Sequence, residues 1–273
     1  MKALENQRDF QNVANLPFCY WCGNNFAPND QTNRDHVPPR NGFKNTDRTP
    51  PLILKTHQGC NSTHSTTDEL IGQLVALQRN YVTPDPAKRK LRMEVYAGHD
   101  FGSVTNINVV DAIWRYIRGF HAALYLSPLF LGRKTITTPF TRARIVDGDL
   151  VLEGPKKEQH FEIVRAIKNQ RAANNVDRII SNNGKVRYEC VWAFADDRNA
   201  VESDQRTTMP RQVCFFALNI YDWKSLGDVG VVPGRGCAGA YFTSDGQAPS
   251  GASILNQFAP NVGNQDPWDP FGL

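Results

Sequence analysis

Three short stretches decide the fold of this chain: Cys19-Tyr20-Trp21-Cys22, Asp35-His36-Val37-Pro38-Pro39 and His57-Gln58-Gly59-Cys60-Asn61-Ser62-Thr63-His64. The first and the third each carry two metal-ligand side chains that are separated by two residues. This spacing turns both donors of a knuckle toward one ion, and two knuckles complete a tetrahedral zinc site without an open position. The pattern therefore predicts a structural zinc that is bound by four side chains: Cys19, Cys22, His57 and Cys60.

An Asp35-His36 dipeptide lies between the two knuckles, and Asn61 directly follows the last cysteine. In this order, the three elements resemble the zinc-stapled branch of the HNH nucleases, the ββα-metal or His-Me finger superfamily, over roughly residues 17–70. The resemblance implies a ββα module that hydrolyses phosphodiester bonds of DNA and leaves 5′-phosphate products. It also implies that Asp35 and Asn61 bind one catalytic Mg²⁺ or Mn²⁺ ion and that His36 is the general base. His57 stands where that branch usually has a cysteine, and zinc accepts imidazole nitrogen as well.

Each of these residues also has a plainer interpretation. A zinc ribbon that only staples a fold needs the same four zinc ligands, and Asn61 can simply cap the helix that follows. His64 is either a third protein ligand of the catalytic ion or a solvated residue at a helix start. The alternative function is therefore a non-catalytic zinc-ribbon protein that binds nucleic acid or acts as a scaffold. A third hypothesis is a second domain that senses a small ligand or a partner and gates the nuclease.

The length of 273 residues is enough for one or two domains with a buried core. No apolar run reaches the length of about 18 residues that indicates a membrane span, and the first residues lack the pattern of a signal peptide. We therefore expect a cytoplasmic protein without membrane contact, a setting in which thiols that bind zinc stay reduced. Cys190 and Cys214 lie in apolar strand-like runs, so we expect them to be core residues.

The formal net charge of +4 is unevenly distributed, because residues 83–226 hold 22 Lys and Arg against 16 Asp and Glu. A basic body beside a nuclease module is expected to grip the phosphates of DNA, and salt should weaken this attraction. A merely solvated basic face explains the same composition. The candidate nucleic-acid contacts are six basic side chains: Lys88, Arg89, Lys90, Arg92, Arg115 and Arg118.

Apolar spacing and turn signals predict the remaining elements. Helices are predicted within residues 1–16, over 66–81 after a capping box, over 106–126 and over 158–173. Extended structure is predicted at 94–105, in a hairpin around Asp147-Gly148, and in a buried antiparallel pair formed by 187–194 and 212–221. On the helix over 106–126, Arg115 and Arg118 face away from the apolar stripe, and Gly119 can indicate close packing of another backbone.

These elements predict an α+β protein in three parts. Residues 1–82 form the zinc-stapled ββα nuclease module, and residues 83–226 form a basic α+β domain that positions DNA. The two prolines of Thr83-Pro84-Asp85-Pro86 end the first part, because proline stops the preceding helix. Residues 227–273 are rich in Gly, Pro and Asn, which predicts an extended or disordered tail. The aromatic side chains of this tail can dock on the body, on a second copy or on a partner protein.

Overall fold

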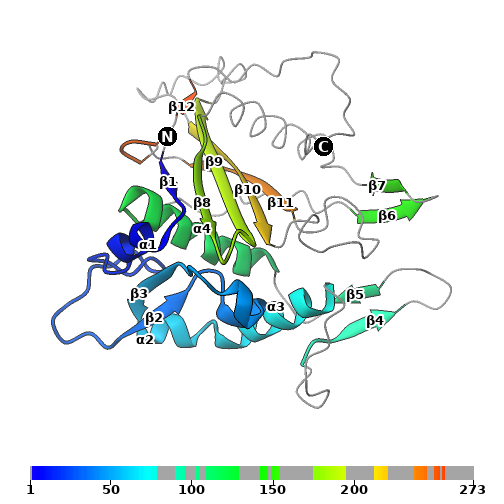
Figure 1. Ribbon diagram of the computed structural model, residues 1–273, viewed down its shortest axis with the longest axis horizontal. Helices are drawn as coiled ribbons and strands as arrows, with labels where there is room; N and C mark the ends of the chain where they lie inside the picture. The colour runs from blue at the N-terminus through cyan, green and yellow to red at the C-terminus, as the bar shows by residue number, and fades with distance from the viewer. Residues whose placement is uncertain are drawn as a thin grey trace, which may run out of the picture. The chain divides into compact units, whose positions relative to one another are not determined.

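The computed structural model describes these parts of the chain: residues 2–78, 90–95, 102–104, 109–128, 142–146, 149–153, 175–194, 212–220, 237–244, 249–252 and 254–255. Helices and strands are mixed within them, which confirms the α+β class (Figure 1). Contacts divide the chain into two compact units. The knuckle unit comprises Glu5–Leu129 and Ser181–Lys185, and the sheet unit comprises Met1–Leu4, Phe130–Ile180 and Val186–Leu273. The boundary predicted at residues 83–86 lies outside the described residues.

The knuckle unit begins with helix α1 (Gln7–Val13), which confirms the helix predicted within residues 1–16. The Asn6 side chain accepts a hydrogen bond from the Asp9 amide at 3.1 Å, and the Asp9 carboxylate accepts one from the Asn6 amide at 3.2 Å. This capping box satisfies two amides that the first turn leaves without partners. Phe10 and Val13 are buried, so one face of α1 packs against the rest of the unit.

A two-stranded hairpin and the helix after it form the centre of the knuckle unit. Strand β2 (Thr32–His36) pairs antiparallel with β3 (Ile53–His57), and the register places Thr32 opposite His57 and His36 opposite Ile53. Two short 3₁₀ turns, η1 (Arg40–Gly42) and η2 (Asn45–Asp47), lie in the connection between the strands. Helix α2 (Gln58–Ser62) starts directly after β3 and packs against both strands. The element order is therefore strand, strand, helix.

Two longer helices pack around this hairpin. Helix α3 (Ser65–Gln78) matches the helix predicted from residue 66, and α4 (Val109–Tyr125) matches the one predicted over 106–126. Between them, β4 (Met93–Val95) and β5 (Gly102–Val104) form an antiparallel pair in the region predicted to be extended. A Cβ atom on Gly119 would lie 2.8 Å from Cγ1 of Val37. The glycine therefore lets α4 approach the side chain of the residue that follows His36, whereas the sequence suggested the approach of another backbone.

The sheet unit is built on one sheet with the strand order β1-β8-β9-β10-β11, and β12 (Ile254–Leu255) pairs with β9 (Figure 1). The strands are β1 (Ala3–Leu4), β8 (Asp177–Ser181), β9 (Val186–Phe194), β10 (Gln212–Ile220) and β11 (Cys237–Ser244). Strands β9 and β10 are antiparallel and contribute buried Tyr188, Trp192 and Phe216, which confirms the buried pair predicted from the apolar runs. Cys190 and Cys214 are also buried, as expected.

Four strands of this sheet were not predicted from the sequence patterns: β1, β8, β11 and β12. Strand β8 pairs with β1, and the Lys2 amide donates to the Asp177 carboxylate at 2.6 Å. Strand β11 pairs with β10 over its whole length, although it belongs to the segment expected to be a tail. The small residues Ala238, Gly239 and Ala240 have low β-propensity, so the sequence gives little indication of a strand. Backbone pairing with β10 stabilises the strand in spite of this low propensity. The remainder of the predicted tail lies largely outside the described residues.

Two other predictions fall partly or wholly outside the described residues. Strands β6 (Arg142–Val146) and β7 (Asp149–Glu153) pair antiparallel, which confirms the predicted hairpin, although its turn at 147–148 is not among the described residues. The helix predicted over 158–173 is also outside them. Within the described residues, no helix combines the length and the apolar character that crossing a membrane requires.

Candidate metal centre and catalytic strand

The first knuckle is a tight turn closed by backbone hydrogen bonds. The Cys19 amide donates to the Asn24 carbonyl at 2.9 Å, and the Gly23 amide donates to the Cys19 carbonyl at 2.8 Å. Gly23 has a φ of 81°, in the left-handed region that glycine adopts without steric cost. The turn therefore brings the Cys19 and Cys22 thiols to the same side of the chain.

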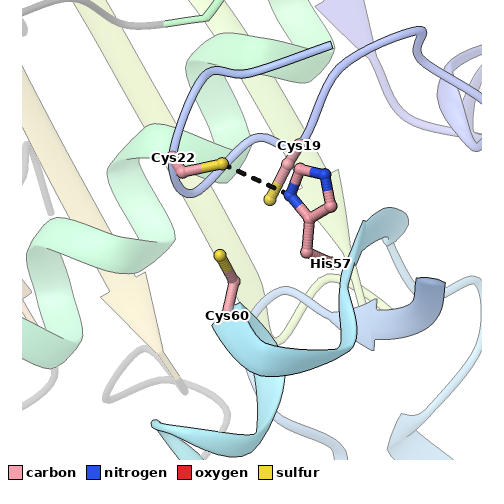
Figure 2. A group of neighbouring side chains, drawn as sticks. All are labelled: Cys19, Cys22, His57 and Cys60. Carbon is pink, nitrogen blue, oxygen red and sulfur yellow. Dashed lines mark hydrogen bonds between the residues drawn. The ribbon is translucent and has the colours of Figure 1, made fainter. Parts of the chain in front are cut away.

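The second knuckle comes from the junction of β3 and α2, where His57 ends the strand and Cys60 lies in the first turn of the helix. The four side chains converge as Figure 2 shows, and their ligand atoms all lie within 4.8 Å of one another. Three thiols and one imidazole are a donor set that zinc prefers in closed, four-coordinate sites. The residues present therefore fit a structural zinc ion, and we refer to these four as the metal cluster.

Asp30 orients the imidazole of the metal cluster. Its carboxylate lies 3.1 Å from His57 Nε2 and accepts a hydrogen bond from the Ala27 amide at 2.6 Å. When Nε2 carries the proton and donates it to this carboxylate, Nδ1 is unprotonated and its lone pair can bind a metal ion. Nδ1 lies 3.3 Å from Cys22 Sγ. Carboxylates commonly hold metal-bound histidines in this way, because the hydrogen bond fixes both the tautomer and the ring orientation.

Two thiols of the metal cluster, those of Cys19 and Cys60, have strongly shifted pKa values. Burial and the charges on Cys19 and Cys22 raise the pKa of Cys60 to about 12. Burial also acts to raise the pKa of Cys19, but hydrogen bonds from Thr56 and from nearby backbone amides outweigh it and lower the value to about 6. The protein alone therefore does not stabilise all three thiolates together, whereas a bound divalent cation favours the deprotonated form of each ligand.

A second group of side chains, the Arg115 cluster, surrounds the carboxylate of Asp35 on strand β2. The Tyr20 hydroxyl and Arg115 Nη2 both donate to Asp35 Oδ2, the latter at 2.7 Å. Arg115 Nη1 donates to Asp68 Oδ1 at 2.5 Å, and Arg115 Nε donates to the Tyr20 hydroxyl at 3.1 Å. The guanidinium is 2% exposed, so it links the first knuckle, β2, α3 and α4 inside the unit.

Burial and charge pairing compete within the Arg115 cluster. Burial raises the pKa of Asp68, and the neighbouring guanidinium partly offsets this shift. Burial and the Asp35 charge also raise the pKa of Tyr20, so its hydroxyl stays protonated and donates. This environment differs from the solvent-facing position that the helical pattern predicted for Arg115. The reason is that its partners, from positions 20, 35 and 68, cover the polar side of α4.

His36 ends strand β2 and is half-buried. Burial lowers its pKa, the Asp35 charge acts in the opposite direction, and Arg40 and Arg48 lower it further. The imidazole is therefore neutral near pH 7, the state in which it can accept a proton. Its ring makes no hydrogen bond to any residue that the structure describes.

The other two predicted catalytic side chains come from α2 and the turn after it. Asn61 lies within α2, and its side chain makes no hydrogen bond to the described residues, so it does not act there as a helix cap. His64 lies between α2 and α3, and its ring packs edge-on against Trp21 with 4.4 Å between ring centroids. Asn61 is thus held one residue from a member of the metal cluster with its amide available.

The predicted phosphate contacts have different environments. Arg118 lies over the Trp21 ring at 5.1 Å, is half-buried, and forms no ion pair with a described carboxylate. Burial lowers its pKa. Lys90 is exposed and pairs with Glu69 at 2.7 Å, and Arg92 is exposed as well. Lys88 and Arg89 lie outside the described residues.

Sequence patterns missed three side chains that shape these sites: Asp30, Tyr20 and Asp68. Asp30 precedes β2 by two residues, and only the pairing of Thr32 with His57 places it near the imidazole. Tyr20 and Asp68 meet Arg115 across long sequence separations, so no local spacing indicates them. No family model, curated protein or solved structure matches the chain.

Proposed function

We propose that this protein is a metal-dependent HNH endonuclease that hydrolyses phosphodiester bonds of DNA. One observation carries the proposal: an Asp-His pair ends the first strand of a hairpin whose second strand runs directly into a short helix, and a Cys/His cluster joins the hairpin to that helix. In a ββα nuclease, this arrangement places a base and metal-binding oxygens on adjacent elements. Asp35-His36 on β2 and Asn61 on α2 hold those positions.

In this proposal, His36 takes a proton from the attacking water. Burial and the two nearby arginines keep its pKa below the ordinary value of 6.5, so the base is unprotonated at neutral pH. A general base must be unprotonated at the working pH in order to accept the proton of the attacking water. The ring is only partly buried and makes no hydrogen bond to the described residues, which supports this role.

Asp35 and Asn61, with His64 as the third candidate, would hold a catalytic Mg²⁺ or Mn²⁺ ion, since such hard cations prefer oxygen ligands. When bound, the ion would supply charge stabilisation for the phosphate and the departing 3′ oxygen. Two features support this set. Oδ1 of Asp35 receives no hydrogen bond from any described residue, and the amide of Asn61 has no partner among them. The single carboxylate indicates a one-metal site rather than a two-metal site.

Basic side chains would bind the phosphates of the DNA backbone. Arg118 is the strongest candidate, because a partly buried guanidinium without a described carboxylate partner gains most from a phosphate. Lys90 and Arg92 are exposed and contribute charge at the surface. Binding should weaken steeply with salt, since phosphate contacts release counterions.

The direct test is nicking of supercoiled plasmid by zinc-loaded protein with and without added Mg²⁺ or Mn²⁺. Wild type should nick only when the ion is added. His36→Ala should lower the rate by about 10²–10⁴-fold, the usual contribution of a general base. Zinc content and circular dichroism should be unchanged, and Gln11→Ala, an exposed position on α1, serves as the matched control. Equal rates for His36→Ala and wild type would contradict the assigned base, and wild type that cuts no form of DNA would contradict the function.

A non-catalytic zinc-ribbon protein that binds nucleic acid is the second candidate. It is favoured by one observation: Arg115 and Tyr20 satisfy Asp35 Oδ2, which gives this carboxylate a structural role that needs no ion. Binding to DNA without cleavage, equal in wild type and His36→Ala, would support this function over the nuclease.

A further inference from the structure

The carboxylate of Asp35 is held asymmetrically. Oδ2 accepts two hydrogen bonds, from the Tyr20 hydroxyl and from Arg115 Nη2. Oδ1 accepts none from the residues that the structure describes. Because the side chain of Asp35 is only 8% exposed, its carboxylate cannot reorient freely, and the two donors determine which oxygen remains available.

Arg115 is itself held by a second carboxylate. Asp68 accepts from Nη1 at 2.5 Å while Nη2 reaches Asp35, so the planar guanidinium spans two acidic groups with both of its terminal nitrogens. A lysine keeps the charge but cannot reproduce this fork, because its ammonium is a single point of donation. The orientation of Asp35 therefore depends on the shape of the guanidinium as well as on its charge.

Helix α4 contacts both neighbours of His36. Arg115 pairs with Asp35, and Gly119, four residues later on the same helix face, accommodates Val37. A Cβ on Gly119 would lie 2.8 Å from Val37 Cγ1. The Val37 amide also donates to the Leu52 carbonyl at 3.0 Å, which extends the hairpin past His36. The segment 35–37 is thus fixed by α4 on both sides of the imidazole.

We infer that Arg115 is a positioning residue: with Tyr20 it fixes Oδ2 of Asp35 and so presents Oδ1 to a divalent cation in the site that includes His36. The inference rests on the proposed function in one respect, the presence of that cation site. Arg115 then acts inside the knuckle unit and is not one of the side chains that contact phosphate. Asp68 supports the guanidinium, and no direct role toward the cation is assigned to it.

Mn²⁺ binding to zinc-loaded protein, followed by electron paramagnetic resonance, tests this role without requiring activity. Wild type should bind Mn²⁺ more tightly than Asp35→Asn, which supplies the baseline for other sites. Arg115→Lys should weaken Mn²⁺ binding by about tenfold or more, although it preserves the positive charge. Asp68→Asn is the matched control, since its amide oxygen can still accept from Arg115 Nη1 and the Arg115–Asp35 pair is unchanged, and Mn²⁺ binding should stay within about threefold of wild type.

Several outcomes would overturn the inference. Mn²⁺ binding by Arg115→Lys that equals wild type would do so, as would an equal loss in Asp68→Asn, because both indicate a purely structural cluster. Wild type that binds no better than Asp35→Asn would also overturn it. If Arg115→Lys does not retain zinc and its circular dichroism spectrum, Tyr20→Phe removes the other donor to Oδ2, and unchanged Mn²⁺ binding there would contradict the role.

Nicking assays on the same samples separate this inference from the proposed function. In an active enzyme, Arg115→Lys should need at least tenfold more Mn²⁺ for half-maximal nicking, and saturating Mn²⁺ should restore most of the rate. Wild type that binds Mn²⁺ through Asp35 but does not cut DNA would refute the nuclease while leaving the positioning role of Arg115 supported by the binding data.

Discussion

The metal cluster and the Arg115 cluster each bring together side chains that can interact with one cation. In the metal cluster, three cysteine thiols and an imidazole converge on a point where a cation fits. In the Arg115 cluster, two carboxylates and a tyrosine hydroxyl converge on a guanidinium that the chain itself supplies. Both clusters connect the short hairpin with neighbouring elements: the Arg115 cluster does so through a cation that the chain supplies, whereas the metal cluster offers a site that fits an external cation.

The two clusters depend on different conditions. Binding of a cation to the thiols competes with protons, so it is sensitive to chelators, acid and oxidation. The guanidinium stays charged across the accessible pH range, and it is limited instead by the cost of burying charges. Tyr20 connects them, since it lies between Cys19 and Cys22 in the sequence and its hydroxyl donates to Asp35.

Loss of the metal cluster should have the largest effect. Cys60→Ala removes one of three thiols, and structural zinc supplies about 10–16 kcal/mol of apparent binding energy that is coupled to folding. We expect the variant to lose zinc and to melt far below wild type, as measured by metal analysis and thermal denaturation. Cys237→Ser, a thiol of strand β11 in the other unit, is the control. Full retention of zinc by Cys60→Ala would show that the cluster is not the binding site.

Removal of the Arg115 guanidinium should have the next largest effect on stability. Arg115→Met removes the cation that pairs with Asp35 and Asp68 and leaves Asp35 only the hydrogen bond from Tyr20, so we expect a loss of about 3–5 kcal/mol in the free energy of unfolding. Asp68→Asn should cost less, because Arg115 still pairs with Asp35. Denaturant titration of both variants checks the order. A larger loss for Asp68→Asn than for Arg115→Met would contradict the central place of the guanidinium.

Tyr20, which lies in the first knuckle and contacts the Arg115 cluster, is expected to contribute less to stability. Tyr20→Phe removes the hydroxyl that donates to Asp35 and accepts from Arg115, so we expect a loss of about 1.5–3 kcal/mol, the range for hydrogen bonds to charged groups. Zinc content should stay at the wild-type level, because the backbone of the knuckle is unchanged. A fall in zinc content in this variant would mean that the two clusters are coupled more tightly than their contacts indicate.

The smallest effect is expected at Asp30, which contacts the metal cluster from outside. Asp30→Asn weakens control of the His57 tautomer, and loss of such a partner typically lowers metal affinity by 10–100-fold. Competition with a chromophoric zinc chelator measures this change. Asp47→Asn, which changes an acidic residue in the β2–β3 connection, is a suitable control. Unchanged zinc affinity in Asp30→Asn would show that the imidazole is oriented by packing alone.

The sequence was informative where the physics is local. Two residues between Cys19 and Cys22 are enough to indicate a knuckle, and the apolar period along 106–126 is enough to indicate α4, because both signals lie within a few turns of chain. The Arg115 cluster had no such signal, since its members at 20, 35, 68 and 115 meet only after the hairpin and two helices have packed.

Strand β11 illustrates a second limit of prediction from the sequence. Its sequence has small residues where strands usually have branched or aromatic ones, and composition averaged over a long segment suggested a tail. The strand forms beside β10, whose Phe216 lies opposite Ala240 in the register. A small residue beside a large aromatic is a pairwise feature, and it becomes visible only when the partner strand is known.

The turn between β8 and β9 limits how the chain can be divided into separately expressed parts. Asn182, Asn183 and Gly184 all have positive φ values, and the Asn182 amide donates to the Pro50 carbonyl at 2.9 Å. This turn therefore belongs to the knuckle unit, while the strands on either side belong mainly to the sheet unit. Residues 1–4 belong to the sheet unit as well, although they precede the knuckle unit in sequence. A single cut cannot release either unit whole, so gene fragments for expression, or a recombination event in evolution, must keep the two together.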